Sequence, residues 1–460
     1  MSLPSPRSES YKPQDHKLSR VRLFLRAQLV RFPLIETLGV WMWRRLVALF
    51  LLFKWKLIIR FGPLRGAYEE SPDLAKVRWI SPQRIAYCAL QEFDIYDYKG
   101  HVIGGEWDRL EKKFEDLDVY IAFKQVCLEG RDWSETIFYQ HILDEINQGH
   151  LPWGCRDKND FDRRCRELTS LFNNIKRDGY RSQRELLSSP SNIPQVLADE
   201  VTVSIGRHGD FLFSDGAHRL AIAKLLGVPV IPVEIAVRHP GWVQFRKEIL
   251  QYTRENGGKT YQSILHPDLK DIPAFHDCDD RFGMILSHMS CRQGRLLDIG
   301  ANWGHFCHCF EDQGFECYAL EDFPIHLHFL EKLKRAENKQ FKTIAKSALA
   351  SREIRDMYFD VVLALNIFHH FLKTKEDYEK FIDLLHHLQM GELFFEPHCP
   401  KEQQMQTAYR NFSPSEFVEF VMTHSSLKRA GCIGTAQDGR SLYRLYNFSS
   451  AERPAPNEYR

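Results

Sequence analysis

The stretch LLDIGANWG, residues 296–304, decides the fold of the C-terminal part of the chain. Its apolar start is typical of a buried strand, and its glycines mark a turn that leads into a helix. Gly300 permits the tight turn, and Gly304 lets the start of the helix pack closely against a ligand. Asp298 stands at the end of the strand. Since parallel sheets bind ligands beyond the carboxyl ends of their strands, the stretch predicts a ligand site there.

Strand and helix patterns alternate from residue 258 to residue 447. The predicted strands are residues 296–299, 315–320, 341–346, 358–366 and 391–396, with helices between them. Two further segments, 431–436 and 441–448, can pair as an antiparallel hairpin. Repeated strand–helix units predict an α/β domain in which helices cover a parallel sheet.

An acidic residue follows the second predicted strand. Glu321 comes about twenty residues after the glycine turn, and an acid at this place can accept hydrogen bonds from both hydroxyls of a ribose. Asn366 follows the fourth strand. The glycine turn, Glu321, the stretch FDVVLALNIFHHF (residues 359–371) and LFFEP (residues 393–397) occur in this order, and together they are much stronger evidence than the turn alone. Glu396, in LFFEP, is a candidate wall of the pocket.

Residues 258–447 resemble class I S-adenosylmethionine-dependent methyltransferases over nearly their whole length. Asp298, Gly300 and Gly304 match the D-x-G-x-G-x-G element of that family, with Asn302 in place of the middle glycine. The resemblance implies a Rossmann-like sheet with a terminal antiparallel hairpin, and S-adenosyl-L-methionine as the cofactor. The cofactor-binding residues that it implies are Asp298, Gly300, Asn302, Gly304, Glu321, Ser347 and Asn366.

His369 and His370 are the candidate catalytic residues, because they follow Asn366 where the cofactor and the acceptor would meet. Methyl transfer needs alignment of the two reactants, and a base only when the acceptor must lose a proton. Either histidine is a candidate for that base. The alternative is that one ring packs beneath the pocket while the other is solvated.

The central segment, residues 75–250, predicts a smaller α+β domain with a helical insert at 107–187. Residues 201–206 and 211–216 read as a hairpin, Asp215–Arg219 opens a short helix, and 228–237 reads as a third strand. This pattern resembles the fold of ParB N-terminal domains and sulfiredoxin. Ala217 stands where sulfiredoxin has its reactive cysteine, so peroxiredoxin repair is not expected.

In ParB proteins and sulfiredoxin, the element that matches Gly216, His218 and Arg219 binds nucleotide phosphates. A free-serine kinase group carries a related D-G-H-H-R element. The resemblance therefore implies a nucleoside triphosphate site at Asp215, Gly216, His218 and Arg219. The alternative is that His218 and Arg219 only cap and pack the hairpin.

The first 66 residues form a basic arm. They hold thirteen lysines and arginines and three acids, so they carry +10 while the whole chain carries only +1. Residues 38–61 contain tryptophans and cations, but their apolar runs are too short to span a bilayer. The arm predicts an amphipathic helix on an anionic membrane surface, with docking on the protein itself or binding of nucleic acid as alternatives. Nucleic acid is the weakest of the three, and residues 448–460 are predicted to be a disordered tail.

Eleven cysteines without a CxxC pair indicate reduced thiols in a cytoplasmic protein. His305, Cys307, His308 and Cys309 crowd on one predicted helix but lack a second ligand pair, so no metal site is expected.

Two functions follow from these patterns. The first is an S-adenosylmethionine-dependent methyltransferase that acts on a small-molecule or glycolipid-like acceptor at the inner membrane face, with a nucleotide-binding or regulatory central domain. The second is a nucleotide-dependent kinase or switch protein whose methyltransferase-like domain is a cofactor-binding scaffold. The sequence does not identify the acceptor, the role of the helical insert or the oligomeric state.

Overall fold

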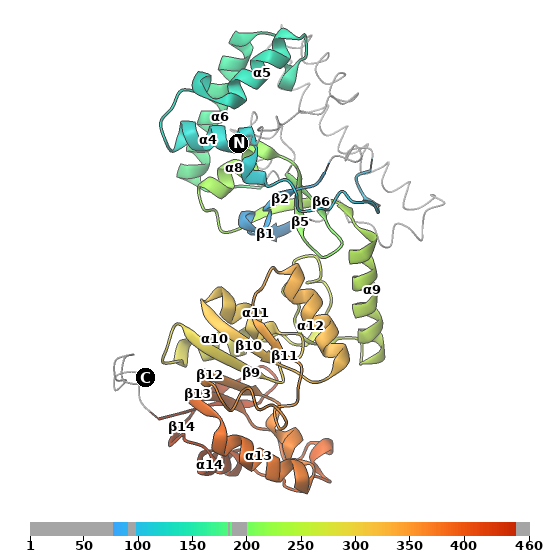
Figure 1. Ribbon diagram of the computed structural model, residues 1–460, viewed down its shortest axis with the longest axis vertical. Coiled ribbons are helices and arrows are strands. Elements are labelled where there is room, and N and C mark those ends of the chain that lie inside the picture. The colour runs from blue at the N-terminus through green and yellow to red at the C-terminus, as the bar shows by residue number, and fades with distance from the viewer. Residues whose placement is uncertain (1–76, 91–97, 183–184, 186–199, 448–460) are drawn as a thin grey trace, which may run out of the picture. The chain divides into compact units, whose positions relative to one another are not determined.

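The computed structural model describes residues 77–90, 98–182, 185 and 200–447. The chain divides into two compact units, the first ending at Phe245 and the second beginning at Arg246, and each is described by itself (Figure 1). The predictions for the basic arm and for residues 448–460 lie outside the described residues. No helix in the described part of the chain has the length and apolar character needed to span a bilayer.

The N-terminal unit is built on a six-stranded mixed sheet with the order β1-β6-β4-β5-β2, in which β3 also pairs with β6. Its strands are β1 (Arg78–Ile80), β2 (Tyr87–Cys88), β3 (His101–Val102), β4 (Val201–Ile205), β5 (Phe211–Asp215) and β6 (Ile231–Arg238). β4 and β5 pair antiparallel, whereas β4 and β6 run parallel. The crossover between β5 and β6 is the short helix α8 (Ala217–Leu225).

Three longer helices precede β4 along the chain and form the helical part of the N-terminal unit: α4 (Asp118–Cys127), α5 (Ile137–Asn147) and α6 (Lys158–Asp178). The 3-10 turns are η1 (Pro82–Arg84), η2 (Phe114–Asp116), η3 (Trp133–Glu135) and η4 (Pro152–Gly154). α4 contacts α8, so the helical part adjoins the sheet through the crossover helix. The elements follow the order expected from the sequence, and the resemblance to ParB and sulfiredoxin stays a prediction.

The C-terminal unit contains a seven-stranded sheet with the order β11-β10-β9-β12-β13-β15-β14. Its strands are β9 (Gly294–Ile299), β10 (Phe315–Leu320), β11 (Lys342–Ile344), β12 (Tyr358–Leu365), β13 (Gln389–Glu396), β14 (Arg429–Thr435) and β15 (Ser441–Tyr446). The first five strands of this order run parallel. β15 pairs antiparallel with both β13 and β14, so the sheet ends in a hairpin.

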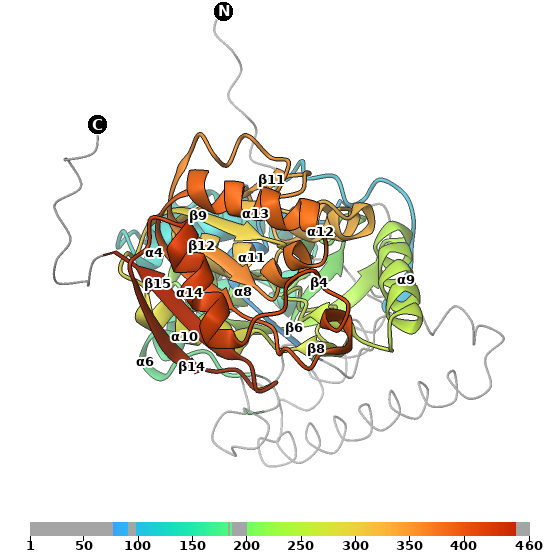
Figure 2. The same ribbon diagram turned by 90° about the horizontal axis from the view of Figure 1, so that it is seen from below.

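Helices cover both faces of this sheet. The helices are α10 (Asp279–His288), α11 (His305–Asp312), α12 (Pro324–Ala336), α13 (Lys375–His387) and α14 (Pro414–His424), with the 3-10 turns η7 (Phe368–Leu372) and η8 (Gln403–Met405). The helix α9 (Pro240–Glu255) begins in the N-terminal unit and ends in this one. A separate parallel pair consists of β7 (Thr260–Gln262) and β8 (Ala274–His276). α13 and α14 lie side by side, as Figures 1 and 2 show.

The central strands β9, β10, β12 and β13 are largely apolar because both faces of the sheet are buried there, whereas the edge strand β14 is mostly exposed. Leu296 and Leu297 are neighbours in β9, yet they belong to different core clusters, since successive side chains of a strand point to opposite faces. Leu297 packs with residues of α13 and α14, and Leu296 with residues of α10, α11 and α12. Double coverage is typical of parallel sheets and explains why these strands show no polar alternation.

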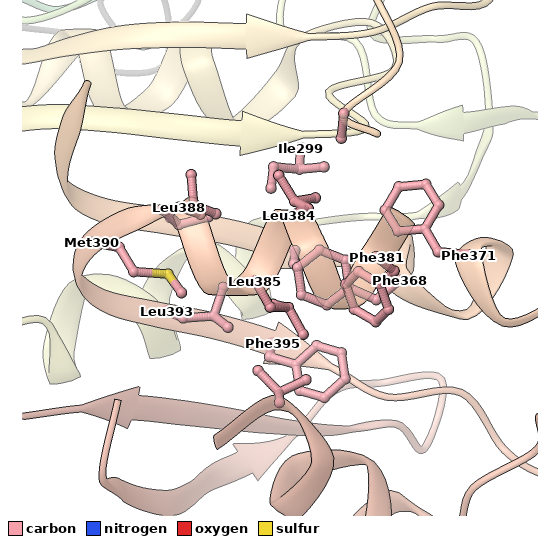
Figure 3. Packing of buried hydrophobic residues seen from close by; sticks show 14 of the residues in the cluster. Ile299, Phe368, Phe371, Phe381, Leu384, Leu385, Leu388, Met390, Leu393 and Phe395 are labelled. Atoms are coloured by element: carbon pink, nitrogen blue, oxygen red, sulfur yellow. The ribbon is translucent and has the colours of Figure 1, made fainter. Parts of the chain in front are cut away.

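Aromatic rings fill the core between α13, η7 and β13 (Figure 3). The ring of Phe368 lies 4.7 Å from that of Phe381 and 5.5 Å from that of Phe395, measured between centroids. All three side chains are fully buried. This packing fixes η7, and therefore the position of the residues that follow β12.

We predict that Phe381→Ala lowers the free energy of unfolding by about 3–5 kcal/mol, because it leaves a cavity in this cluster. Guanidinium unfolding of the full chain measures the change. Lys380 is an exposed neighbour of Phe381 on the same helix, so Lys380→Ala should change the free energy of unfolding by less than about 0.5 kcal/mol. Equal losses in the two variants would contradict the packing described above.

Candidate active site at the carboxyl edge of the C-terminal sheet

The turn after β9 is bonded to the end of β10. The amides of Gly300 and Ala301 both donate to the Leu320 carbonyl, at 2.8 and 3.0 Å, and the Asn302 amide donates to Glu321 Oε2 at 2.8 Å. Gly300 has φ +75°, and a Cβ there would lie 2.8 Å from the side chain of Ile367. The predicted need for glycine at residue 300 thus has two causes, the backbone conformation and the lack of space.

Glu321 is held as an anion. Its Oε1 accepts hydrogen bonds from the amides of Asp322 and Phe323, at 3.1 and 3.0 Å, and lies 3.6 Å from His326 Nδ1. Burial opposes ionisation of Glu321, but the hydrogen bonds from His326 and from these backbone amides outweigh it and keep its pKa below the usual value.

Asp298 has the opposite character. Burial, followed by the negative charge of Glu321, raises the pKa of Asp298 to about 7. Its nearest hydrogen-bond partner is the Cys307 thiol, with Sγ 4.0 Å from Oδ2. Among the described residues, no lysine, arginine or histidine forms an ion pair with Asp298. Two carboxyl groups therefore share a buried site that a cationic ligand would stabilise.

Two polar atoms beside the turn also lack a partner. Asn302 Oδ1 and Trp303 Nε1 are buried and have no hydrogen bond to any described residue. Asn302 Nδ2 lies 3.3 Å from His326 Nδ1, and Asn302 has the left-handed φ of +53°. Buried polar atoms are normally paired, so these two fit a site that a polar ligand completes. The residues around the turn thus suit a cationic nucleoside such as S-adenosylmethionine.

Ser347 and Asn366 follow β11 and β12. Ser347 is half-buried, and its carbonyl accepts hydrogen bonds from the amides of Ala350 and Ser351. Asn366 has φ +55° and a fully engaged amide: Oδ1 accepts from Arg440 Nη1, and Nδ2 donates to Tyr261 Oη at 2.5 Å. The sequence predicted Asn366 as a contact, and the structure adds two partners that are distant in sequence.

The two candidate catalytic histidines differ in environment. His369 is buried, and neither ring nitrogen has a hydrogen-bond partner among the described residues. Burial and the neighbouring His370 lower the pKa of His369 to about 2. His370 is exposed as a whole, but partial desolvation of its ring, together with Lys373, lowers its pKa to about 4. Both rings are neutral at pH 7, and both are weak bases.

The sequence indicated Glu396 as a candidate pocket wall, but it did not reveal the other charged residues that meet at the same edge. Arg281 donates to both oxygens of Glu396, at 3.2 and 2.7 Å, and to Asp438 Oδ2 at 2.6 Å. Arg440 Nη2 donates to Glu402 Oε1 at 2.9 Å. The sequence predicted the hairpin of residues 431–436 and 441–448, but nothing in it indicated which side chains Asp438 and Arg440, in the turn between them, would contact.

In the N-terminal unit, Gly216 and Asp215 form the turn before α8. Gly216 has φ +89°, and a Cβ there would lie 3.0 Å from the Cα of Val201, so this close approach is to the protein's own backbone. Asp215 Oδ1 accepts from the Gly216 amide at 2.7 Å. The predicted glycine-dependent turn exists, and its tight side faces β4.

His218 and Arg219 point into the N-terminal unit. The His218 ring lies among aromatic rings, with centroids 6.0 Å from Phe123 and 5.2 Å from Trp153, and burial lowers its pKa to about 3. Arg219 is buried, donates to Glu200 Oε2 at 3.2 Å, and stacks over Tyr180. Both side chains already have internal contacts, and nucleotide binding at Asp215–Arg219 stays a prediction.

Within the described ranges, no group of three or more His, Cys, Asp or Glu side chains is placed to hold a metal ion. Of the four residues His305, Cys307, His308 and Cys309, which crowd on one helix, His305 already has a hydrogen bond. Its Nδ1 lies 3.0 Å from the Ser263 carbonyl, and this nitrogen must carry a proton to donate to that oxygen. All eleven cysteines are free thiols.

Comparison with known proteins finds a family match for the part of the chain that contains the glycine turn after β9. Residues 297–388 match a family model described as a methyltransferase domain. No match was found among curated protein sequences.

Solved structures include several with similar parts. The bifunctional kinase-methyltransferase WbdD is 17% identical, with a TM-score of 0.35, over 43% of this chain and 46% of WbdD. The chain therefore matches less than half the length of WbdD. A Pyrococcus horikoshii OT3 protein, PH0226, is 15% identical, with a TM-score of 0.33, over 43% of this chain and 99% of PH0226. The Bacillus subtilis YcgJ protein is 14% identical, with a TM-score of 0.29, over 36% of this chain and 98% of YcgJ. By the family match, the C-terminal unit contains a methyltransferase domain.

Proposed function

We propose that the C-terminal unit transfers a methyl group from S-adenosylmethionine to a small-molecule or glycolipid-like acceptor. The observation that carries the proposal is the pair of carboxyl groups, Asp298 and Glu321, at the ends of adjacent parallel strands around the glycine turn. They stand in the part of the chain that matches the methyltransferase domain, and Asp298, buried beside Glu321 without an ion pair to any described residue, suits a ligand that brings positive charge.

The cofactor would supply a methyl group already activated on a sulfonium, so the protein has to bind and align it. Asp298 would accept hydrogen bonds from the cationic methionine part, and Glu321 would exchange its bonds to backbone amides for bonds to the ribose hydroxyls. Asn302 and Trp303 would gain partners for their unpaired polar atoms. Ser347 and Asn366 complete the set that the sequence predicted, and Asn366 stands closest to the acceptor side.

On the acceptor side, alignment outweighs base catalysis. His369 and His370 have pKa values well below 7, so neither takes up a proton readily at neutral pH. This environment favours an acceptor that already offers a lone pair at neutral pH, such as an anionic oxygen. Contacts made by Asn366 and by its partners Tyr261 and Arg440 would then orient the acceptor.

The other parts of the predicted function have less support. The nucleotide-dependent kinase or switch function requires Arg219 to leave Glu200 and bind phosphate, and no observation favours that exchange. Association with the inner membrane face depends on the basic arm, residues 1–66, which lies outside the described residues. Both stay predictions, and methyl transfer is the function that the described residues support best.

We predict that the full chain binds S-adenosylmethionine, as measured by isothermal titration calorimetry. Asp298→Ala should abolish binding, and Glu321→Ala should weaken it by about 1–3 kcal/mol, the usual loss for a charge-assisted hydrogen bond. Glu316→Ala is the matched control, because Glu316 lies near the opposite end of β10 and pairs with Lys342 on the surface. The proposal fails if the wild-type protein does not bind the cofactor at millimolar concentration.

A pH dependence follows from the raised pKa of Asp298. Its ordinary value is 3.8 and its value in the fold is about 7, so the folded state binds the proton more tightly than the unfolded state. Between these values Asp298 stabilises the fold less as the pH rises, and above about pH 7 its contribution is constant. Asp298→Asn cannot lose a proton, so the variant should gain stability relative to the wild type from pH 5 to pH 8. Urea unfolding at the two pH values measures this gain, and an unchanged difference would show that Asp298 is ionised throughout.

A further inference from the structure

A segment that precedes the β9 strand crosses the carboxyl edge of the sheet. We call residues 252–281 the strap; it includes β7, β8 and the start of α10. At its beginning, the ring of Tyr252 packs against Trp303, with the centroids 5.5 Å apart, and Tyr252 Oη lies 3.1 Å from His326 Nε2. The strap therefore starts beside the predicted cofactor-binding turn.

The middle of the strap contacts the start of α11 and the end of β12. The Ser263 carbonyl accepts from His305 Nδ1 at 3.0 Å, and Tyr261 Oη accepts from Asn366 Nδ2 at 2.5 Å. At the end of the strap, Arg281 pairs with Glu396 at the end of β13. The strap thus touches residues that follow β9, β10 and β12, and the last residue of β13.

The chemistry of the partners fixes the orientation of the Asn366 amide. Arginine has only donors, so the side-chain oxygen of Asn366 must face Arg440. The amide nitrogen must then face Tyr261, whose hydroxyl oxygen has to accept. Tyr261 is exposed as a residue, at 36%, but partial desolvation of its hydroxyl raises its pKa. The hydroxyl therefore stays protonated at neutral pH, and its hydrogen points away from Asn366.

Asn366 also has a strained backbone. Its φ of +55° is uncommon for a residue other than glycine, and such conformations persist where the surroundings hold them in place. Arg440 and Tyr261 hold the side chain from two sides, one from the β14–β15 hairpin and one from the strap. Without Tyr261, the only side-chain hydrogen bond recorded for Asn366 within the described residues is the one from Arg440.

We propose that Tyr261 is a positioning residue of the methyl-transfer site, whose hydroxyl fixes the Asn366 amide and holds the strap over the reacting end of the cofactor. The inference rests on the proposed function, because it assumes that S-adenosylmethionine binds beneath the strap. Cofactor exchange then requires the Tyr261–Asn366 hydrogen bond to open.

The test compares the full-length wild type with Tyr261→Phe and with Tyr358→Phe. Tyr358 is the first residue of β12, and Asn366 follows the last one. Tyr358→Phe therefore removes a tyrosine hydroxyl at the edge of the sheet opposite to the proposed site. Stopped-flow fluorescence measures the dissociation rate of S-adenosylmethionine. Tyr261→Phe should raise that rate about tenfold, the scale of one lost hydrogen bond, and Tyr358→Phe should leave it unchanged.

Two further measurements separate positioning from a structural role. Hydrogen exchange should show that the cofactor protects residues 256–278 in the wild type and protects them less in Tyr261→Phe. Asn366→Ala removes the donor to Tyr261 together with the acceptor for Arg440. In the Asn366→Ala background, Tyr261→Phe should add nothing further to the dissociation rate.

The outcomes distinguish the inference from the function on which it rests. If the wild type binds S-adenosylmethionine and Tyr261→Phe matches it in dissociation rate and protection, the inference is wrong and the proposed function stands. Additive effects of Tyr261→Phe and Asn366→Ala also overturn the inference. If the wild type does not bind the cofactor, both are wrong.

Discussion

The carboxyl edge of the C-terminal sheet depends on the backbone amides of residues 300–302, which donate to the end of β10. Two of them satisfy the Leu320 carbonyl, and the third, from Asn302, helps to keep Glu321 ionised. These bonds set the shape of the turn and bring it beside the acid on the next strand. Without them, neither the left-handed conformation of Asn302 nor the close placement of the two carboxyl groups would be favourable.

The same bonds create a charge imbalance that a ligand can relieve. Glu321 has several donors and stays ionised, so Asp298, buried beside it with only a thiol nearby, holds its proton up to about pH 7. The ligand-free site therefore stores an unfavourable interaction between two acids. A cationic group placed next to Asp298 would release the proton and convert that cost into binding free energy.

The local patterns of the sequence predicted those structural features that are determined by residues close together along the chain. The apolar strand at 296–299, the glycine turn and the acid at residue 321 are all set by local conformation and by burial on both sheet faces, and the structure has them in place. Side-chain partners depend on the tertiary fold. Arg219 was predicted either to contact a ligand or to pack the hairpin, and the sequence did not indicate its partner Glu200, nineteen positions away.

Distance along the chain also explains why the sequence did not predict the side-chain contacts on the acceptor side of the site. Tyr261 and Asn366 are 105 positions apart, and Arg281 and Glu396 are 115 apart. No periodicity or turn signal connects such residues. His369 and His370 show a related limit, because adjacent residues in a 3-10 turn face different surroundings and the sequence cannot say which of them is buried.

One physical cause, removal of water, explains the charge states across the edge. Burial raises the pKa of Asp298 and of Tyr261 and lowers that of His369, and each shift favours the neutral form. The charges that remain include Glu321, arginines that are already paired with acids, and Lys373 beside His370. A sulfonium would add a positive charge next to Asp298 and Glu321. Transfer of its methyl group to an anionic acceptor neutralises both reactants, and charge neutralisation is more favourable in a poorly solvated site than in water. Burial of the edge beneath the strap would therefore contribute to the rate directly, in addition to aligning the two reactants.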